Sequence, residues 1–486
     1  MKKAYFLLAA MLFATINMSG RITLPSIISD NMVLQQKTDA KLWGWAEPGE
    51  TVSVSTSWGR HASATASPEG KWSLYIKTPS HCREQWVKIL SGKTGESIKI
   101  SNVLVGEVWL TSGQSNMEFW SMPKKGSSWM TGMYNWEDEV ENADYPNIHM
   151  FKIEEAWDHK AQHTNCKGKW VICSKEVAKT FSAISFLFAR ELHTTLQQPV
   201  GVILCAVGGT HAESWIREET MRKDTIYNRV FEGYNPEKST KNGYPHKIPA
   251  AVWNAMVNPI AGYTIKGNIW YQAESNAWRS EDYAPIFTDL VNDWRLLWGQ
   301  KRLPFYFIQV APYHQLPGGI RLEQAKVWEQ KMLKDIGMAT AIDVGDSLDI
   351  HPKNKVIPAH RLVLWPLAKE YGYKIESSGP QIRSIKSTQG KLIISFRNGK
   401  GLYAGTLLPD NTISPAPAGS TTSVRYLHIA GEDGVFLPAH SSIENGKLTV
   451  WHPQIPEPVH VKYCTEDYCK GTLYNAAGLP AYPFSL

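Results

Sequence analysis

Apolar and polar positions follow three successive patterns along the chain. From about Arg21 to Ser101, short runs in which apolar and polar residues alternate, such as Thr51 to Val54, are separated by turn signals such as Glu47-Pro48-Gly49. When apolar and polar residues alternate with a period of two, every second side chain points towards one buried face of a strand. This region is therefore predicted to form a small all-β sandwich.

The pattern changes near Val103, where continuous apolar runs begin to alternate with segments of helical period. The apolar runs predict buried strands at Val103–Leu110, Val200–Val207, Thr264–Tyr271, Pro304–Ala311 and Met338–Val344. The helical segments fall near residues 177–197, 281–298, 320–336 and 354–372. This order predicts an α/β domain with a parallel sheet covered on both faces, and chemistry is expected at the carboxyl ends of its strands.

A β pattern returns from about Gly379, with turn signals at Asn398-Gly399 and Glu444-Asn445-Gly446. The chain has 486 residues, which is enough for about three domains of the common ~150-residue size. We therefore predict a signal peptide at residues 1–19, an N-terminal β-sandwich domain at 20–102, an α/β domain at 103–378 and a C-terminal β-rich domain at 379–486.

The first residues are typical of an export signal. Two lysines at positions 2 and 3 precede an apolar run from Ala4 to Ile16, and small or polar residues follow at Ser19-Gly20. Such a run is too short to span a bilayer, and no later run of eighteen apolar residues occurs. The protein is therefore expected to be exported to the periplasm or the extracellular space, without membrane insertion.

Charge and cysteine content remove several partner classes. The formal net charge is +6, and Lys2 and Lys3 lie in the predicted signal peptide, so the surplus gives little support to nucleic-acid binding. The sequence contains neither a C-x-x-C nor an H-E-x-x-H motif, so no metal site is expected. In an exported protein the close pairs Cys166/Cys173 and Cys464/Cys469 could each form a disulfide, or the cysteines could be free thiols.

The first predicted strand of the α/β domain leads into a turn that presents a serine. It runs into Gly113-Gln114-Ser115-Asn116-Met117, where the glycine permits a tight turn just before Ser115. The string is close to G-x-S-x-G, with Met117 in the position of the last glycine. A serine in this place is also a common helix N-cap, so a nucleophilic role requires a base, a group that orients the base, and oxyanion donors.

Three other predicted strand ends supply candidates for these parts. Paired glycines at Gly208-Gly209 could turn backbone N–H groups towards a developing negative charge, although they also suit a plain turn. The third block, Gln272 to Asn276, carries side chains that donate or accept hydrogen bonds. In the last block His351 follows Asp349 by two residues, so Asp349 could hold one ring nitrogen while the other faces a serine. Four strand ends together therefore favour acyl transfer.

These blocks resemble those of the sialate O-acetylesterase branch of the SGNH-type hydrolases. The nucleophile block Gly113 to Met117 is similar to that family's block. The segment Trp270 to Asn276, which contains the third block, is similar too, except that Ala273 replaces a glycine. The resemblance covers nearly the whole chain, because other segments are similar too: Ser29–Gln35, Trp43–Gly49, Asp293–Arg295 and Leu473–Ala481. It implies an SGNH-hydrolase-like, flavodoxin-like catalytic domain between the two β-rich regions.

The resemblance also implies roles for individual residues and no cofactor. Ser115 would attack an acetyl carbonyl on a sugar, and His351 would accept its proton and pass it to the departing hydroxyl. Donors to the oxyanion would be the N–H groups of Ser115 and of Gly209 or Gly208, together with a third-block side chain, Gln272 or Asn276. Asp349 is the nearest carboxylate to His351, Asp346 is the alternative, and a backbone carbonyl could also orient the imidazole.

Substrate contacts are expected from polar residues beside these blocks and from tryptophans. The chain contains 20 tryptophans, whose flat rings suit both cores and sugar-binding surfaces. Those in strand or helix patterns are expected in the core, namely Trp43, Trp45, Trp109, Trp270, Trp294 and Trp298. The candidates for contact with the sugar are Gln114, Asn116, His211, Glu274, Trp120 and Trp215, with Trp129, Trp136, Trp157 and Trp278 as further stacking candidates.

A second serine motif competes with Ser115. Gly345-Asp346-Ser347-Leu348 spells the signature of the related GDSL lipases, but it follows the last strand of the domain, beside His351. A nucleophilic Ser347 would need a base from the C-terminal β-rich region, where no histidine has a matching context. Ser115 is therefore the predicted nucleophile.

The sequence thus predicts an exported serine esterase that removes acetyl groups from sialic acids or related glycans. An acetylesterase of plant polysaccharides such as xylan or pectin remains an alternative, because the blocks describe ester chemistry rather than the sugar. A carbohydrate-binding protein without catalysis is the alternative from another class, and the intact set Ser115, His351 and Asp349 argues against it.

Overall fold

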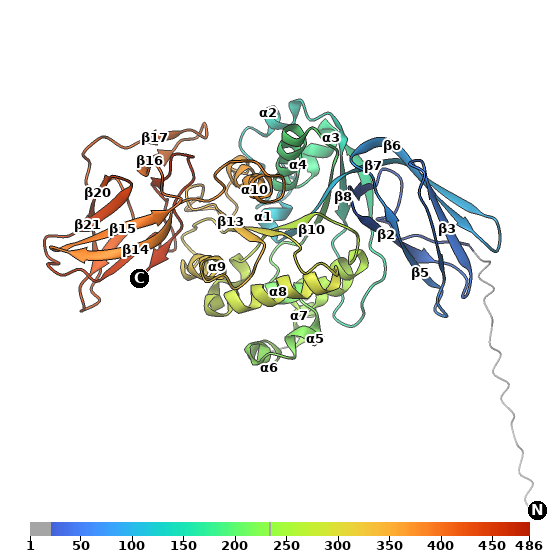
Figure 1. Cartoon of the computed structure of the whole chain (residues 1–486). Coiled ribbons are helices and arrows are strands. Elements are labelled where there is room, and N and C mark those ends of the chain that lie inside the picture. The colour runs from blue at the N-terminus through green and yellow to red at the C-terminus, as the bar shows by residue number, and fades with distance from the viewer. Residues whose placement is uncertain (1–20, 233–234) are drawn as a thin grey trace, which may run out of the picture.

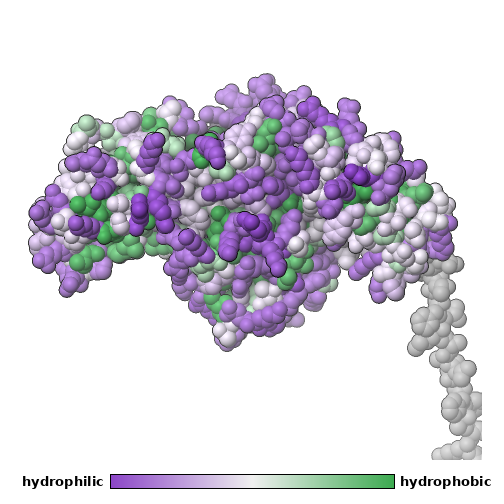
Figure 2. Space-filling view, viewed as in Figure 1, coloured by the Kyte–Doolittle hydropathy of each residue, from purple (hydrophilic) through white to green (hydrophobic). Residues whose placement is uncertain are grey.

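A computed structural model describes residues 21–232 and 235–486. It has a mixed α/β fold in which an α/β region lies between β-rich segments at the two ends of the molecule (Figure 1). The predicted signal peptide lies outside the described residues. Figure 2 shows a surface on which polar side chains predominate, with apolar groups scattered among them. In the described part of the chain no helix is long and apolar enough to cross a membrane.

The central sheet is mixed rather than wholly parallel. Its strands pair in parallel from β13 to β8, and the edge strand β9 runs antiparallel to β8. β8 and β9 fall in the long segment after the nucleophile block, where no strand was predicted. The strands lie in the order β13 (Ile336–Thr340), β12 (Phe305–Gln309), β11 (Gly267–Tyr271), β7 (Ser97–Gly113), β10 (Val200–Ala206), β8 (Tyr145–Ile153) and β9 (Gly168–Cys173).

Helices cover both faces of this sheet, as predicted (Figure 1). The predicted helix at 177–197 is two helices, because the chain turns at Phe181 and the Ser182 side chain caps a new helix by accepting the Ser185 N–H at 3.1 Å. The predicted helix at 320–336 ends at Glu329, and the next strand starts soon after. The main helices are α3 (Lys175–Thr180), α4 (Ala183–Leu196), α8 (Tyr283–Leu297), α9 (Gly319–Glu329) and α10 (Val356–Lys369).

Several shorter helices lie in the connections. α1 (Ser115–Glu118) directly follows β7, and the 3-10 helices η1 (Ala212–Trp215) and η6 (Glu274–Asp282) follow β10 and β11. The other short helices in the described residues are α2 (Trp136–Glu141), α5 (Glu218–Met221), η2 (Thr225–Tyr227), α6 (Asn228–Glu232), α7 (Pro236–Lys241), η3 (Pro245–Lys247), η4 (Trp253–Val257) and η5 (Asn258–Ile260).

The N-terminal strands share their core with the α/β region. β7 is longer than predicted, because it pairs with β6 in the N-terminal sheet and then continues into the central sheet. Alternating burial along β5 matches the predicted period of two. The N-terminal strands are β1 (Val33–Gln35), β2 (Asp39–Trp45), β3 (Thr51–Thr56), β4 (His61–Thr65), β5 (Lys71–Lys77) and β6 (Cys82–Ser91).

The C-terminal strands form a second core, to which Ile342 of the α/β region contributes. They are arranged in sheets of the order β14-β15-β21-β20, β17-β16-β23 and β19-β18-β22-β24. Their bounds are β14 (Gln381–Thr388), β15 (Lys391–Arg397), β16 (Tyr403–Leu407), β17 (Ile413–Pro415), β18 (Leu427–Ala430), β19 (Leu437–Pro438), β20 (His440–Glu444), β21 (Lys447–Trp451), β22 (His460–Tyr463), β23 (Leu473–Tyr474) and β24 (Phe484–Ser485).

The cysteines do not form the two short disulfide loops considered above. All six are free thiols, and five of them are buried. Burial raises the pKa of Cys166 and of Cys173 to about 12, because the thiolate loses its hydration. These two side chains therefore behave as small apolar core residues rather than as reactive groups.

Gly113 packs closely against the neighbouring strand of the central sheet, and this contact fixes the position of the turn that leads to Ser115. Its φ is +142°, and a Cβ atom there would lie 2.1 Å from the backbone carbonyl oxygen of Tyr271. Since that oxygen belongs to the neighbouring strand β11, it cannot move without disturbing the sheet.

We expect Gly113→Ala to destabilise the protein by about 1–3 kcal/mol or more, because the added methyl overpacks a rigid contact. Chemical denaturation would measure the loss. Gly431→Ala is the matched control, since its new Cβ would meet its nearest atom at 3.5 Å, an ordinary contact. Equal stability of the two variants would contradict the close approach described here.

Candidate active site

Ser115 lies at the carboxyl end of the central strand β7. The strand ends at Gly113, the Gln114 N–H donates to the Tyr271 carbonyl oxygen at 3.0 Å, and Ser115 opens helix α1. The Ser115 residue is 8% exposed and lines a cavity of about 580 Å³. The strand-to-helix turn therefore presents the hydroxyl to this cavity, as the sequence predicted.

His351 is brought to Ser115 from the loop that follows β13. Its Nε2 lies 2.8 Å from Ser115 Oγ. Asp349 Oδ1 accepts the His351 backbone N–H at 2.8 Å and lies 3.5 Å from Nδ1. The ring is flanked by Trp129 and Phe119, with centroids 4.9 Å and 6.2 Å away. The packing and the carboxylate together determine how the imidazole is oriented.

The surroundings of His351 keep its imidazole neutral. Burial, together with the positive charge of Lys355, lowers its pKa to about 4, although the negative charge of Asp349 opposes both effects. At neutral pH the ring is therefore uncharged, and Nε2 can accept a proton from the adjacent hydroxyl.

Lys355 is a buried lysine that the sequence gave no reason to select. It is 1% exposed, and its Nζ donates to Asn116 Oδ1 at 2.6 Å and lies 4.5 Å from the centroid of the Phe119 ring. Burial lowers its pKa, the negative charges of Glu274 and Asp349 partly offset this effect, and the resulting pKa is about 7. The lysine thus stands among acidic groups from two different blocks.

Asn116 connects three of the four blocks. Its Nδ2 donates to Glu274 Oε1 at 2.6 Å and to the Ile350 carbonyl oxygen at 3.1 Å, while its Oδ1 accepts from Lys355. Burial raises the pKa of Glu274, and the hydrogen bond from Asn116 partly offsets this effect. Asn116 does not line the cavity, whereas Glu274 does.

The glycine turn after β10 lies directly against Ser115. The Gly208 N–H donates to Glu118 Oε2 at 2.9 Å, so this donor is already engaged. Within the described residues, the N–H groups of Ser115 and Gly209 donate to no acceptor. Gly209 lines the cavity with a φ of +70°. Of the two glycines considered, Gly209 is the one with a free donor.

Gln272 and Asn276 form a buried network rather than part of the cavity wall. Gln272 Nε2 donates to the Thr210 carbonyl oxygen at 3.1 Å and to Asn276 Oδ1 at 2.8 Å. Asn276 Nδ2 in turn donates to Glu213 Oε2 at 2.8 Å. These bonds tie the segment after β10, which contains Thr210 and Glu213, to the third block. They use both N–H groups of the Gln272 amide.

The other predicted substrate contacts are divided between the cavity and its surroundings. Gln114 lines the cavity, and its Oε1 accepts the Ser275 N–H at 3.3 Å. Trp215 is fully buried in the core, where its Nε1 donates to Thr210 Oγ1 at 3.0 Å. His211 and Trp120 lie outside the cavity lining, and the Nζ atom of Lys124 lies 4.9 Å from the centroid of the Trp120 ring.

Sequence reasoning missed several residues that line the cavity. One of them, Glu118, lies in α1, and the others lie in connecting segments without a motif. These others are Lys124, Glu155 and His246. Burial, together with the negative charge of the neighbouring Glu155, raises the pKa of Glu118 to about 7. Only the position of Glu118, three residues after Ser115 on the same helix, could have indicated it in advance.

Ser347 lies in a different cavity, of about 350 Å³, which is shared with the C-terminal segment. Its backbone carbonyl oxygen, rather than its hydroxyl, faces His314 Nδ1. The second serine motif is therefore not paired with an imidazole in the way that Ser115 is.

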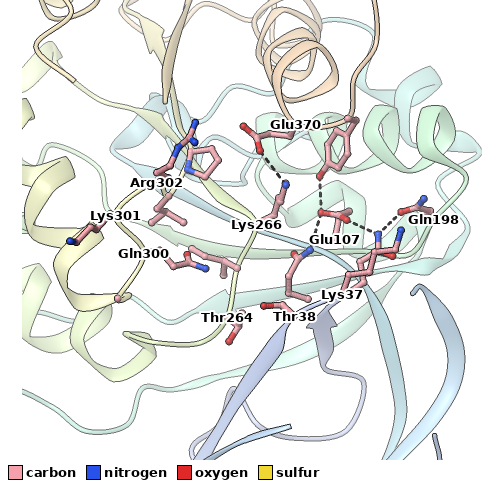
Figure 3. Close-up of a pocket in the computed structure, with 17 residues that line it drawn as sticks. Lys37, Thr38, Glu107, Gln198, Thr264, Lys266, Gln300, Lys301, Arg302 and Glu370 are labelled. Atoms are coloured by element: carbon pink, nitrogen blue, oxygen red, sulfur yellow. Dashed lines mark hydrogen bonds and ion pairs between the residues drawn. The ribbon is translucent and has the colours of Figure 1, made fainter. Parts of the chain in front are cut away.

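A larger cavity, of about 860 Å³, lies where the N-terminal segment meets the central sheet (Figure 3). Two of its carboxylates, Glu107 and Glu370, are bonded to other groups of the lining. Glu107 accepts hydrogen bonds from Gln35, Gln36 and Tyr371, and Lys266 lies 3.1 Å from Glu370. These pairs join the segments around the cavity, so size alone does not identify the functional site.

Known proteins match most of the chain. The family model described as carbohydrate esterase, sialic acid-specific acetylesterase, matches residues 105–356, which include Ser115 and His351. Sialate O-acetylesterase of Mus musculus is 28% identical over 435 residues, covering 76% of this chain and 78% of that protein. The Homo sapiens protein of the same name is 27% identical over 410 residues, covering 76% and 75%.

A solved structure resembles the whole fold. The crystal structure of a carbohydrate acetylesterase from Xanthomonas citri has a TM-score of 0.82 and 26% sequence identity, and the match covers 96% of this chain and 99% of that one. The family model spans more than half of the chain, and the geometry at Ser115 suits ester chemistry. The chain therefore belongs to the family of sialic acid-specific acetylesterases among the carbohydrate esterases, and it is a carboxylic ester hydrolase.

Proposed function

We propose that this protein hydrolyses O-acetyl esters on sugars, with Ser115 as nucleophile, His351 as general base and Asp349 as the group that orients the histidine. The observation that carries this proposal is the 2.8 Å contact between Ser115 Oγ and a neutral His351 Nε2 beside an open cavity. A nucleophile and base within hydrogen-bond reach are the signature of covalent acyl transfer.

The reaction has two balanced steps. Ser115 Oγ attacks the acetyl carbonyl carbon as its proton moves to His351 Nε2, and the C–O bond to the sugar breaks as that proton passes to the departing hydroxyl. Water then attacks the acetyl-serine, with His351 again accepting and returning a proton, and acetate leaves. Asp349 stabilises the transient imidazolium, which its position beside Nδ1 permits.

The negative charge on the carbonyl oxygen needs donors that are already in place. The N–H groups of Ser115 and Gly209 are the best candidates, since neither has another acceptor in the described part of the chain. Gln272 could add a donor only by exchanging one of its two present N–H hydrogen bonds, whereas Asn276 uses one of its two amide N–H groups, to Glu213. Each oxyanion donor typically contributes about 3–4 kcal/mol to the transition state.

Sialic acids are the proposed substrates, because the matched family and the mammalian relatives are named for them. Acetylated plant polysaccharides such as xylan and pectin are the second candidate, since the Xanthomonas citri relative is named only as a carbohydrate acetylesterase. Acetate release from a panel of acetylated sialic acids, xylans and pectins would separate the two. We further propose export, on the basis of the N-terminal sequence.

Replacing Ser115 by alanine should leave the fold intact and lower the hydrolysis of p-nitrophenyl acetate and of sugar acetates by several orders of magnitude, as removal of a catalytic serine does. Ser347→Ala is the matched control and should keep full activity. The proposal fails if Ser115→Ala retains most of the activity, or if Ser347→Ala loses it.

The pH profile should reflect the low pKa of His351. Because only the neutral imidazole accepts a proton, kcat/KM should fall as the pH drops through about 4, where His351 protonates. Lys355, with a pKa of about 7, is charged at that pH. In Lys355→Met the pKa of His351 should rise towards its ordinary value of about 6.5, which moves the acid limb to higher pH.

Lys355→Arg keeps the positive charge and should keep the acid limb near that of the wild type. Lys353→Met, which removes a less buried lysine from the same loop, is a second control. An acid limb that stays in place in Lys355→Met would show that the lysine charge does not act on His351.

A further inference from the structure

Two exposed aromatic rings lie at the outer end of the catalytic cavity. Trp157 is 40% exposed and Tyr244 is 51% exposed. Both make edge-on contacts with His246, at centroid distances of 5.7 Å from Trp157 and 6.3 Å from Tyr244. The Nζ atom of Lys247 lies 4.6 Å from the centroid of the Tyr244 ring. These residues form an aromatic ledge, defined here as Trp157, His246 and Tyr244.

The ledge continues the wall of the cavity that contains Ser115. Trp157 and His246 line that cavity together with Gly209. A Cβ atom on Gly209 would lie 3.5 Å from His246 Nε2, so the histidine packs directly against the glycine turn. A ligand that extends outward from Ser115 past this turn therefore meets the rings of the ledge.

The backbone next to Trp157 is firmly held although the ring is exposed. The Asp158 N–H donates to the Ala251 carbonyl oxygen at 2.9 Å, and Asn254 Nδ2 donates to the Asp158 carbonyl oxygen at 2.9 Å. Asp158 Oδ1 also accepts the Lys160 N–H at 2.8 Å. The position of the ring is thus prepared before any ligand arrives, which reduces the entropy lost on binding.

The chemistry of the ledge suits a sugar ring. The face of an indole or phenol ring carries negative charge density, and the C–H groups on one face of a pyranose are weakly positive and apolar. Glu155 and Lys124, which line the same cavity, are able to bond the hydroxyl groups around such a ring. The ledge and these two side chains therefore offer the aromatic faces and the hydrogen-bonding groups that a carbohydrate-binding site needs.

The acetylated sugar itself must lie over Ser115 and His351, because its ester carbonyl reacts there. The cavity of about 580 Å³ is in the range of sites for ligands larger than a single sugar. We propose that the aromatic ledge binds a second sugar residue, so that the substrate is an acetylated sugar within an oligosaccharide or glycan chain rather than a free monosaccharide. This inference rests on the proposed esterase function.

Other tryptophans do not offer the same site. Trp215 is fully buried, so no substrate can reach its ring. Trp278 is 77% exposed but does not line the catalytic cavity. Trp278→Ala is therefore a matched control, since it removes an exposed indole outside the cavity.

The test compares each variant on matched pairs of substrates: acetylated free sialic acid against acetylated sialyllactose, and acetylated xylose against acetylated xylotriose. Trp157→Ala should lose roughly tenfold in kcat/KM on the trisaccharide, mainly through KM, which corresponds to about 1.4 kcal/mol. Activity on the free sugar and on p-nitrophenyl acetate should change less than twofold. Tyr244→Ala should give a smaller loss of the same kind, and Trp278→Ala should give none.

Equal losses on the trisaccharide and the free sugar, or no loss on either, would overturn the second-sugar site. A partial recovery of the trisaccharide KM in Trp157→Phe would support it, because phenylalanine restores a flat ring at this position. Failure of the esterase proposal is seen separately, as activity that persists in Ser115→Ala.

Discussion

The arrangement of the site depends on one buried lysine. The ammonium group of Lys355 donates to Asn116, and Asn116 holds both Glu274 and the carbonyl oxygen of Ile350, the residue before His351. The Lys355 pKa of about 7 leaves this group partly charged at neutral pH, and a buried polar group that loses its hydrogen-bond partner typically costs about 1–3 kcal/mol. The nucleophile turn, the third block and the histidine loop are therefore held together as one unit.

The same charge connects the stability of the site with its chemistry. Burial removes His351 from water, and the nearby ammonium of Lys355 further disfavours a second positive charge, so the imidazole stays neutral. The Asp349 carboxylate opposes this effect, and it is available to stabilise the imidazolium that the proposed acyl transfer would form. The balance between Lys355 and Asp349 thus gives a base that is ready at neutral pH and still tolerates a proton for the short time required.

The sequence predicted the strand ends better than the surroundings of the site. The runs before Ser115 and Gly208 stand out because both faces of those strands are buried, which leaves a continuous apolar signal. β8 and β9 were missed because polar residues, such as Asn147, His149 and Lys152 in β8, interrupt their apolar runs, and because both strands lie within a long connection. The antiparallel course of β9 follows from its direct return alongside β8.

Lys355 and Glu118 could not be recognised from sequence, because a single lysine or glutamate has no pattern until folding buries it. Trp215 was expected near the sugar because it follows the glycine turn, but the short helix η1 directs it into the core against Trp270. Trp157 was among the predicted stacking candidates and lines the cavity, but its placement there depends on hydrogen bonds between Asp158 and a segment about 95 residues later. Such long-range contacts leave no local signal.

The central claim is that Ser115 is an activated nucleophile. A fluorophosphonate probe reacts with serines whose hydroxyl is activated by a neighbouring base, and peptide mass spectrometry then locates the modified residue. The account predicts stoichiometric labelling of the peptide that carries Ser115, lost when His351 is replaced by alanine. Labelling at Ser347, or a folded protein that remains unlabelled, would contradict it.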